Sequence, residues 1–478
     1  MSQTTENPSV STAQPAAENL KGRRGFLKTG AAAAAGVSLA ALPVESYAQV
    51  AGSDKLKVGI VGTGGRGSKA VIQTLNANDG AVLSAAGDVF EERLMGTFAK
   101  RKAGGLGQIL GQIEKNDNLK NQIDLPKDRQ FVGFDAYQNV IDSSDVVVLT
   151  TPPGFRPMMF EAAINAGKHV FMEKPVCTDA KGYNRVIKAA KMADEKGLKV
   201  VVGLQRHYQD KYLQAFAKVH EEGLIGDIIS AQCWWNGGRP WTVARDPEWS
   251  ELTYQMHNWY HFDWVCGDHI AEQHVHNIDI VNWFVSGDSA NGGHPVKAQG
   301  MGGRTGWEPK TTGNIFDHHY VEFKYDNGVV MNSQCRHIKG TFRKVDEEIH
   351  GSKGILYMGQ GKITDRNGKT LWQHRTDREG GTDPYQVEHN KLHAAIKNDT
   401  PLNNAYYGAH SSFTSCLGRL ATYHGQEITW DEATGSDFEL VPDGMTWDTP
   451  APVQPVNDKL EYDSAMPGTT KLPWQKKA

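Results

Sequence analysis

The chain has 478 residues, of which 39% are hydrophobic and 22% are charged. This length suits roughly two or three domains, and the composition is that of a globular protein with sizeable cores. The formal net charge of -4 at pH 7 shows no basic excess, so we do not expect nucleic acid as a partner.

The first 48 residues have the pattern of an export signal. Arg23 and Arg24 precede a short apolar run over residues 31–42, and a Ser-Tyr-Ala sequence ends at Ala48. An arginine pair, a short hydrophobic segment and an Ala-x-Ala-like end are typical of a twin-arginine signal peptide. A buried alanine-rich helix is the alternative, and it would need neither the arginines nor the small residues. The pattern predicts residues 1–48 as a cleaved signal and a periplasmic or otherwise exported protein. Its mature form should have no membrane span, because the run is too short.

A dinucleotide-binding pattern begins at residue 55. Residues 55–61 predict a buried strand that runs directly into Gly-Thr-Gly-Gly-Arg-Gly at 62–67, which fits G-x-G-x-x-G. Glycines at this spacing allow a tight turn and a close approach of the backbone to a pyrophosphate, at the start of a helix expected over 68–75. A second strand over 81–87 ends in Asp88, where a carboxylate would bond the adenosine ribose and repel a 2′-phosphate. An ordinary turn residue is the alternative for Asp88.

This pattern predicts NAD as the cofactor, with NADP less expected. The residues expected to bind it in this part of the chain are Gly62, Gly64, Gly65, Arg66, Gly67 and Asp88. The twin-arginine route carries folded proteins, so it suits a protein that loads its cofactor before export. We therefore expect NAD to be tightly bound.

Strands and helices continue to alternate up to residue 203. Further buried strands are expected over 145–150, 169–172 and 199–203, with helices over 157–166 and 179–196. The segment 104–127 reads as an insertion on this frame. Alternating strands and helices are typical of a doubly wound parallel sheet, so we predict an α/β Rossmann domain over residues 54–203.

The sequence Ala-Gly-Lys-His-Val-Phe-Met-Glu-Lys-Pro at 166–175 resembles the Gfo/Idh/MocA oxidoreductases, of which glucose-fructose oxidoreductase and inositol dehydrogenase are typical. The resemblance covers most of residues 55–435. In such enzymes the lysine of Glu-Lys-Pro reaches the nicotinamide ribose and the substrate hydroxyl, and the Lys-Pro bond is often cis. The resemblance implies a catalytic role for Lys174. The alternative is that Lys174 is a solvated lysine on the surface. Other expected contacts of NAD here are Thr151, Pro152, Glu173 and Lys174.

The family's second motif places an aspartate and a histidine one helical turn apart in a glycine-led segment. Residues 267–283 read GDHIAEQHVHNIDIVNW, and the matching positions are Glu272, in place of the usual aspartate, and His276. Residues i and i+4 share one face of a helix, which Asp279 continues. The resemblance implies that His276 is the general base or acid and that Glu272 orients it.

The spacing of Glu272, His274 and His276 is also open to a metal site. In a regular helix the side chains at i+2 and i+4 point apart, so these three would not converge on one ion. The five cysteines are scattered and fit neither a disulfide framework nor a cysteine metal site. We therefore expect no metal, and we expect His274 to pack away from the reacting centre.

From about residue 204 the pattern changes to strand-like segments separated by glycine-rich turns. Such segments occupy residues 226–235, 320–325, 329–334 and 354–358. They predict an α+β domain over 204–440 with an open, mainly antiparallel sheet, which in the family binds substrate and makes subunit contacts. The resemblance thus implies a homo-oligomer, a dimer or a tetramer. Residues 441–478 are rich in Pro, Asp and Thr and predict an extended arm or flexible tail.

Six of the 12 tryptophans fall between Trp234 and Trp264. Indole rings pack well against the C–H faces of sugars, so this cluster could contact a carbohydrate. Packing into the domain's own core or a subunit contact are the alternatives. The residues proposed to contact the substrate are Arg156, Arg206, His207, Trp235 and Asp279.

These patterns favour an exported NAD-dependent oxidoreductase that acts on a CH–OH group of a sugar, glycoside or polyol. Two alternatives remain. One is a glycosidase or lyase that oxidises, eliminates and re-reduces with retained NAD, although the chain lacks the Tyr-Pro-Thr-His sequence that we associate with such hydrolases of N-acetylgalactosamine. The other is a catalytically silent sugar-binding protein, which the joint presence of Lys174, Glu272 and His276 disfavours.

Overall fold

The computed structural model describes residues 55–477, apart from 102, 307–308 and 376–382. The predicted export signal over 1–48 lies outside the described residues. In the part of the chain that is described, no helix combines the length and apolar character needed to cross a bilayer.

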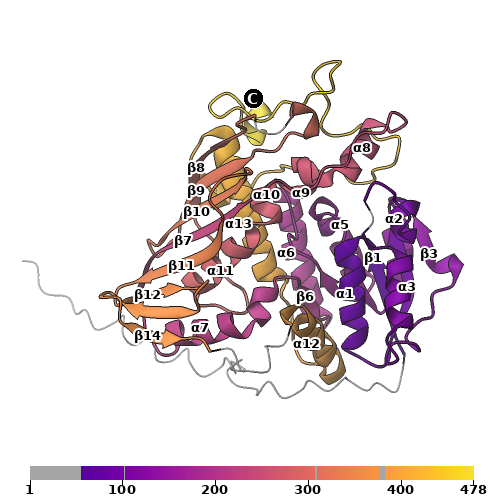
Figure 1. Cartoon of the computed structure of the whole chain (residues 1–478), viewed down its shortest axis with the longest axis horizontal. Helices are drawn as coiled ribbons and strands as arrows, with labels where there is room; N and C mark the ends of the chain where they lie inside the picture. Colours follow the sequence, from indigo (N-terminus) through magenta and orange to yellow (C-terminus); the bar gives the residue numbers. More distant parts are fainter. Residues whose placement is uncertain (1–54, 102, 307–308, 376–382, 478) are drawn as a thin grey trace, which may run out of the picture. The chain divides into compact units, whose positions relative to one another are not determined.

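The nucleotide-binding domain is built on a six-stranded sheet in the order β3-β2-β1-β4-β5-β6 (Figure 1). All five strand pairs are parallel. The strands other than the edge strand β3 are almost wholly buried, as expected for a parallel sheet covered by helices on both faces. Their bounds are β1 Leu56–Val61, β2 Ala81–Asp88, β3 Gln130–Val132, β4 Val146–Leu149, β5 His169–Met172 and β6 Val200–Val202.

The order of strands reverses between β1 and β4, which lie side by side and lead to opposite halves of the sheet. In such sheets a crevice forms at the carboxyl ends of the strands, where ligands bind. The segment expected to be an insertion contains α3, and its Leu106, Ile109 and Ile113 join the core of this domain. The helices of the domain are α1 Gly65–Asn76, α2 Glu91–Met95, α3 Leu106–Glu114, α4 Ala136–Asp142, α5 Arg156–Asn165 and α6 Ala180–Glu195.

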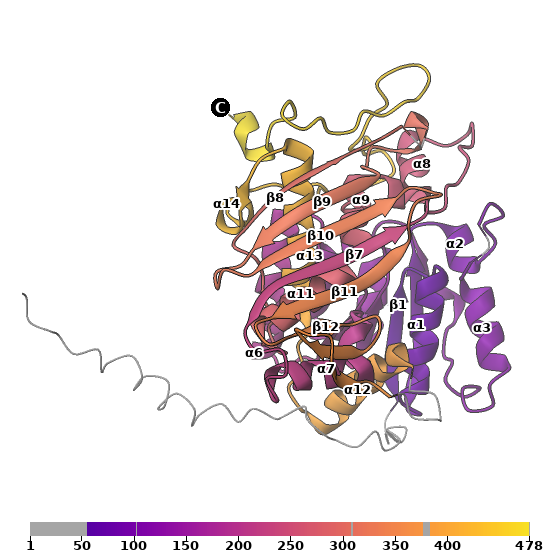
Figure 2. The ribbon, with the colours of Figure 1, turned by 60° about the vertical axis from the view of Figure 1, so that its left-hand side comes forward.

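The second domain contains a nine-stranded sheet in the order β14-β13-β12-β11-β7-β10-β9-β8-β15 (Figure 2). Only β7 and β10 run parallel, and the other pairs are antiparallel. Burial alternates along β9 and β10, because one face packs against helices. The strands are β7 Ile228–Gly237, β8 Lys297–Gly303, β9 His318–Lys324, β10 Val330–His337, β11 Lys344–Gly351, β12 Gly354–Tyr357, β13 Lys362–Asp365, β14 Thr370–Gln373 and β15 Ile428–Thr429.

The predicted fold class, a Rossmann domain followed by an α+β domain with a mainly antiparallel sheet, is confirmed. Helix α13 packs against both α6 and strands β8 and β9, so it lies between the two sheets (Figure 1). Helix α12 packs against α1 and adds Leu392 to the core of the nucleotide-binding domain. The helices of this part are α7 Asp210–His220, α8 Glu251–His257, α9 Asp263–Cys266, α10 His269–Glu272, α11 Val275–Ser286, α12 Pro384–Asn398, α13 Ala405–His424 and α14 Trp430–Thr434.

The prediction of one regular helix through Glu272 and His276 is wrong. Helix α10 ends at Glu272, α11 begins at Val275, and Gln273 and His274 lie between them. The backbone carbonyl of Glu272 accepts a hydrogen bond from Lys174 Nζ at 2.6 Å, whereas the amide of His276 donates to Gln273 O at 3.4 Å. The helical bond from residue 276 to residue 272 is therefore replaced by a bond to a side chain from the other domain.

The C-terminal segment over residues 441–477, which we call the C-terminal arm, runs along the surface of both domains and ends in a short 3-10 helix. Five of its side chains nevertheless belong to the largest hydrophobic core, namely Val441, Met445, Ala451, Tyr462 and Leu472. The arm is therefore packed against its own chain.

Candidate active site

A cavity of about 1280 Å³ lies at the carboxyl ends of the parallel strands. It exceeds the roughly 300–1,000 Å³ of a usual small-molecule site, so it can hold two ligands together. Both domains and the C-terminal arm line it. Its lining residues include Gly62, Gly64, Gly65, Arg66, Gly67, Asp88, Phe90, Arg93, Arg101, Phe134, Thr151, Pro152, Arg156, Glu173, Lys174, Met256, Trp259, Glu272, Gln273, His276, Tyr385, Gly444, Met445, Thr446 and Trp447.

The glycine turn after β1 fits a dinucleotide by its geometry. Gly62 has φ +89°, and a Cβ there would lie 2.8 Å from the amide nitrogen of Thr151. At Gly67 a Cβ would lie 2.0 Å from Gly62 O, so only glycine lets α1 pack on the turn. A Cβ at Gly64 would meet no described atom within 4 Å, because that position faces the cavity. The N-terminus of α1 and the bare backbone therefore leave the space that a pyrophosphate needs.

Asp88 stands at the end of β2, where the sequence placed it, and lines the cavity. Its Oδ2 accepts the backbone N–H of Thr63 at 2.9 Å, and its Oδ1 accepts the N–H of Phe90 at 3.3 Å. Burial raises the pKa of Asp88, while these bonds and the charge of Arg93 oppose the rise. The carboxylate is thus fixed at the rim, as ribose recognition requires.

Two arginines that the sequence reasoning missed line the cavity near Asp88. The Arg93 guanidinium lies 4.0 Å from the centre of the Phe98 ring, and that of Arg101 lies 3.6 Å from the centre of the Trp241 ring. Burial, together with the positive charge of Arg93, lowers the pKa of Arg101 to about 10. Two like charges held close together at a cavity wall favour an anionic ligand. Both arginines follow β2 within 13 positions of Asp88, and that proximity was their only signal in the sequence.

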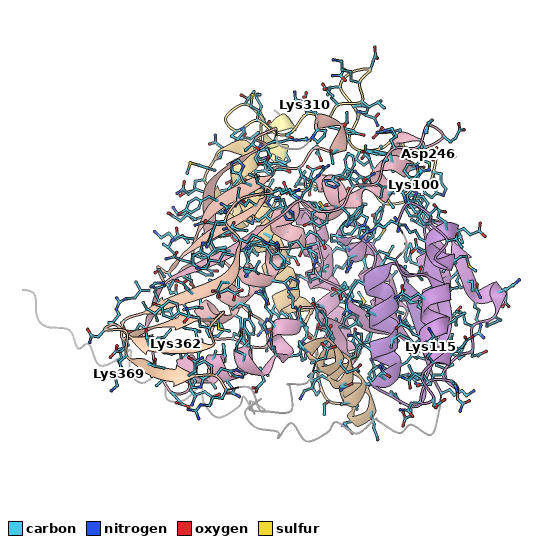
Figure 3. All side chains as sticks on the ribbon, in the orientation of Figure 1. Lys100, Lys115, Asp246, Lys310, Lys362 and Lys369 are labelled. Carbon is cyan, nitrogen blue, oxygen red and sulfur yellow. The ribbon has the colours of Figure 1, made fainter. Side chains whose placement is uncertain are left out.

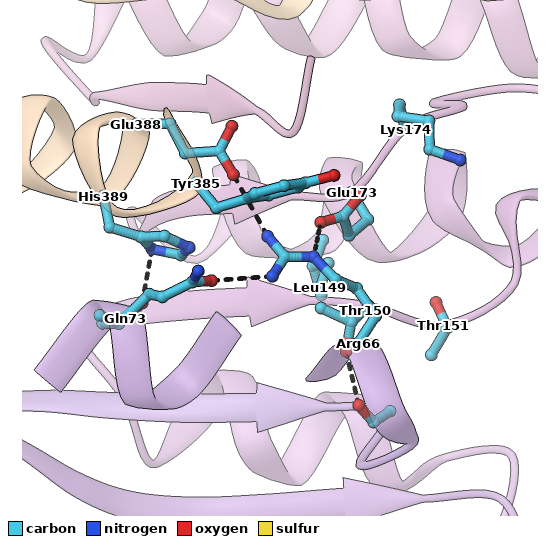
Figure 4. A network of polar contacts seen from close by, with 12 residues as sticks. Arg66, Gln73, Leu149, Thr150, Thr151, Glu173, Lys174, Tyr385, Glu388 and His389 are labelled. Atoms are coloured by element: carbon cyan, nitrogen blue, oxygen red, sulfur yellow. Dashed lines mark hydrogen bonds and ion pairs between the residues drawn. The ribbon is translucent and has the colours of Figure 1, made fainter. Parts of the chain in front are cut away.

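Arg66, in the glycine motif, bridges two carboxylates (Figure 4). Its Nε donates to Glu173, its Nη2 lies 3.2 Å from Glu388 Oε1, and its Nη1 donates to Gln73 Oε1 at 2.8 Å. The Tyr385 ring lies 4.8 Å from the guanidinium. Burial raises the pKa of Glu388 well above its ordinary value, and the negative charge of Glu173 raises it further. Arg66 and Glu173 thus lie beside each other at the cavity.

Lys174 follows β5, and its peptide bond to Pro175 is cis, as the resemblance implies. Its Nζ donates to the carbonyl of Glu272 at 2.6 Å and to the carboxylate Oε1 at 3.1 Å. Both side chains are buried at the cavity wall. Burial raises the pKa of Glu272, and the charges of Lys174 and Arg156 oppose the rise. This ion pair joins the two domains at what we call the catalytic end of the cavity.

His276 lies in the first turn of α11 and lines the same cavity, with 7% of its surface exposed. Burial and the positive charges of Lys174 and Arg206 hold the pKa of His276 well below its usual value. The imidazole is therefore neutral at neutral pH and can accept a proton. Within the described part of the chain no hydrogen bond joins His276 to Glu272, whose carboxylate bonds Lys174 instead.

Arg156 lines the cavity but is largely occupied by the backbone. Its guanidinium donates to the carbonyls of Leu149, Thr151 and Glu173, at the ends of β4 and β5. Burial lowers the pKa of Arg156 to about 10. The side chain holds two neighbouring strand ends in register where Thr151, Pro152 and Lys174 meet the cavity.

The other expected substrate contacts lie outside the cavity wall. Arg206 pairs with Glu347 and donates to the carbonyl of His276 at 3.1 Å. His207 Nε2 lies 2.9 Å from Asp279 Oδ2 in a buried contact. Trp235 stacks beside His276 with ring centres 6.0 Å apart. His276 and Asp279 lie one turn apart on α11, and His276 lines the cavity whereas Asp279 bonds His207 behind it. Arg206, His207 and Trp235 therefore support α11 rather than line the cavity.

Of the six clustered tryptophans, Trp259 lines the cavity and Trp264 is buried, where it donates to Gln255 Oε1 at 2.7 Å. Trp249 lies 4.3 Å from Lys100, whose ammonium pairs with Asp246 at 2.9 Å where the two domains meet (Figure 3). Most of the cluster is thus domain packing. Cavity residues that the sequence reasoning missed include Met256, Gln273, Tyr385, Met445 and Trp447.

Within the described residues, the group of potential metal ligands that converges is Asp268, His269 and His319, and it is buried away from the cavity. Asp268 is already engaged: Tyr423 donates to its Oδ2 at 2.6 Å, and His269 Nδ1 lies 2.7 Å from its Oδ1. His274 Nε2 lies 2.8 Å from Ser333 Oγ, and neither residue lines the cavity. Glu272, His274 and His276 do not form such a group.

Comparison with known families identifies the two domains. Residues 56–204 match the model described as the oxidoreductase family with an NAD-binding Rossmann fold, and residues 213–357 match the C-terminal domain of the same family. The chain belongs to the Gfo/Idh/MocA family. Its first domain is an NAD-binding Rossmann domain.

Two inositol dehydrogenases of the family resemble the chain in sequence. The chain is 29% identical over 230 residues to an inositol 2-dehydrogenase/D-chiro-inositol 3-dehydrogenase of Halalkalibacterium halodurans. The aligned residues cover 48% of this chain and 53% of the relative. It is 25% identical over 306 residues to an inositol 2-dehydrogenase of Rubrobacter xylanophilus, covering 64% of this chain and 71% of the relative. The chain therefore spans between about half and seven tenths of the length of these relatives.

Solved structures of the family share the fold. The scyllo-inositol dehydrogenase of Lactobacillus casei with bound NAD(H) and scyllo-inositol superposes with a TM-score of 0.54 at 18% identity, over 79% of this chain and 99% of that one. The aldose-aldose oxidoreductase of Caulobacter crescentus gives a TM-score of 0.56 at 15% identity, over 78% and 99% of the two chains.

Proposed function

We propose that this protein is an NAD-dependent dehydrogenase that oxidises a CH–OH group of a cyclic polyol or a sugar. The observation that carries the proposal is the convergence of Lys174, Glu272 and His276 at one end of the cavity that begins at the glycine turn. The names of the relatives, which are inositol dehydrogenases, support a polyol or sugar as the substrate class.

Each of the three residues has one role in this proposal. The residues at the glycine turn would hold NAD, which would supply the hydride acceptor for the carbinol carbon. The imidazole of His276 takes the hydroxyl proton; burial and the charges of Lys174 and Arg206 lower its pKa, so it is present in the neutral form that can do so. The ammonium of Lys174 donates a hydrogen bond to the same oxygen and stabilises the negative charge that develops there. Glu272 holds Lys174 in place through its carboxylate and its carbonyl. The reduction in the reverse direction uses the same groups.

The second domain supplies the side chains that can select the substrate. Trp259, Met256 and Gln273 line the cavity from that domain. An indole face packs against the C–H face of a sugar or an inositol ring, and an amide bonds a hydroxyl. Trp259 and Gln273 are therefore the proposed substrate contacts, in place of Arg206, His207, Trp235 and Asp279.

The direct test is a screen of purified protein with inositols, sugar alcohols, free sugars and aryl glycosides in the presence of NAD. We expect absorbance of NADH to appear with at least one cyclic polyol or sugar, and to stay absent in His276→Ala. Release of an aryl alcohol without net NADH would instead support a glycosidase that retains its NAD. Binding of sugars with neither reaction would contradict the proposal.

We also propose that residues 1–48 direct the protein through the twin-arginine route to the periplasm. The support is the arginine pair, the short apolar run and the Ser-Tyr-Ala end at Ala48. Replacement of Arg23 and Arg24 by lysine should leave precursor in the cytoplasm, whereas the unaltered chain should yield a periplasmic form that begins near Gln49. Efficient export of the lysine variant would contradict this proposal.

A homo-oligomer is the third part of the proposal. Its support is the second-domain sheet, whose helix-free face the family uses for subunit contact. Light scattering on the eluted peak of a gel-filtration column should give a mass of two or four chains. A mass of one chain at micromolar concentration would contradict it.

A further inference from the structure

The C-terminal arm is fixed to the nucleotide-binding domain where it leaves the body of the protein. The backbone N–H of Leu440, directly before the arm, donates to Asp179 Oδ2 at 2.8 Å. Asp443 Oδ1 accepts from Arg185 Nη1 at 2.7 Å. Asp179 caps α6 and Arg185 lies on it, so this anchor is a helix of the Rossmann domain.

Further along, the same arm is fixed to the second domain. The carbonyl of Val453 accepts from Gln255, and the Tyr462 hydroxyl donates to Glu251 Oε1 at 2.5 Å, both on α8. The amide of Tyr462 donates to the carbonyl of Lys310 at 3.1 Å, and the arm passes this residue at the top of the molecule in Figure 3. The arm therefore crosses from one domain to the other.

Between the two anchors, Gly444, Met445, Thr446 and Trp447 line the cavity. The Trp447 ring lies 5.1 Å from the Phe90 ring and 4.9 Å from the Phe134 ring, measured between centres. Phe90 donates its N–H to Asp88, and the amide of Gly133 donates to the carbonyl of Asp88 at 3.1 Å. Trp447 thus lies beside the carboxylate that selects the adenosine ribose, and we call this region the adenosine end.

Trp447 is 41% exposed although two aromatic rings hold it in place. An indole left open at the wall of a nucleotide cavity offers a face on which a base can stack. Residues 444–447 lie outside both ranges that match the family models.

We propose that Trp447 and the arm segment Gly444–Trp447 form part of the NAD site, where the indole packs on the adenine and the arm retains the cofactor between turnovers. Because the arm is anchored on both domains, the adenosine end cannot open without breaking contacts at one anchor. The inference rests on the NAD binding that the proposed function also needs, and it does not depend on the identity of the substrate.

The test is the rate at which bound NADH dissociates, followed by stopped-flow fluorescence when excess NAD displaces it. Trp447→Ala should accelerate dissociation about 10- to 100-fold, the effect of removing an aromatic ring from a stacked base. Trp447→Phe should recover most of the wild-type rate. The matched control is Met466→Ala, a 62% exposed residue of the same arm, which should leave the rate unchanged. Affinity for ADP-ribose should fall by the same factor as affinity for NAD in Trp447→Ala.

Four outcomes decide the matter. Unchanged dissociation from folded Trp447→Ala would overturn the inference, and so would an equal acceleration in Met466→Ala. A raised KM for the substrate with an unchanged NADH dissociation rate would place Trp447 at the substrate and also overturn it. A wild-type protein that binds no NAD would remove the proposed function together with this inference. Thermal unfolding without NAD shows whether Trp447→Ala is folded, and if it is not, Trp447→Leu provides the same comparison.

Discussion

The two ends of the cavity are built on different principles. At the catalytic end, Lys174 and Glu272 form one ion pair across the two domains, and the charge of Lys174 contributes to the low pKa of His276. At the adenosine end, Asp88 is fixed by backbone amides, and the rings of Phe90, Phe134 and Trp447 pack against one another at the cavity wall. Residues in direct contact are energetically coupled, so substitution of one impairs the function of its partners. The effects of substitutions at independent contacts add instead. Substitutions at the first end should therefore stop turnover with NAD still bound, and substitutions at the second should weaken NAD with turnover preserved.

The largest effect is expected for His276→Ala. Loss of the proton acceptor should lower kcat on the order of 10²- to 10⁴-fold, the usual contribution of a positioned acid or base. The affinity for NADH, measured by fluorescence titration, should change less than about threefold, since the side chain lies at the other end from Asp88. Normal kcat in this variant on a true substrate would refute the mechanism.

Lys174→Met should lower kcat by about 10² to 10³, because it removes a donor to the oxygen on which charge develops. It should also move the pH profile. The positive charge of Lys174 lowers the pKa of His276, so its removal raises that pKa, and the fall of kcat/KM on the acidic side should shift to higher pH. The exposed Lys188→Met serves as the control and should leave both the rate and the profile unchanged. An acidic limb that does not move would separate Lys174 from His276.

Asp88→Ala should act on binding alone. The carboxylate favours a free 2′-hydroxyl and repels a phosphate, and its loss leaves Arg93 and Arg101 lining the cavity without this neighbouring negative charge. We expect the preference for NAD over NADP to fall about tenfold or more, the value of one hydrogen bond to a charged group. Titration of both cofactors against both proteins measures this. Equal affinity of the unaltered protein for NAD and NADP would contradict the role of Asp88.

The smallest effect on turnover is expected for His274→Asn, two positions from His276. The His274 side chain bonds Ser333 and does not line the cavity. We therefore expect kcat to change less than about threefold, while the free energy of unfolding decreases. Burial lowers the pKa of His274 to about 3, far below the roughly 6.5 of an unfolded chain. The unfolded state therefore gains protons first as the pH falls below about 6.5, and this destabilises the folded protein.

His274→Asn has no group at position 274 that takes up a proton on unfolding. The urea concentration at its unfolding midpoint should therefore decrease less between pH 7.5 and pH 5 than that of the unaltered protein. A loss of kcat as large as that of His276→Ala, or release of a metal ion, would show that His274 belongs to the reacting centre.

Much of the fold could be predicted from the sequence because the patterns that indicate its strands, turns and helices involve only neighbouring residues. The apolar run at 55–61 followed by the glycine turn requires only neighbouring residues to form strand, turn and helix, and β1 and α1 lie there. The short strand β3, at Gln130–Val132, escaped prediction because an edge strand of three residues carries too little periodicity to be seen.

By itself the sequence determined the Rossmann domain, the position of Asp88 at a strand end, and Lys174 and His276 as candidates. Only the tertiary structure decided that Glu272 pairs with Lys174, that Arg206 supports His276 from behind, and that Trp447 reaches the cavity. The Lys174–Glu272 contact joins residues 98 positions apart, and its bond to the Glu272 carbonyl interrupts the helix that the local pattern predicts. The spacing of residues within one segment determines which side chains lie on the same face of a helix or strand. Which residues pack against that face depends on contacts between segments that are distant in the sequence, and no local pattern encodes those contacts.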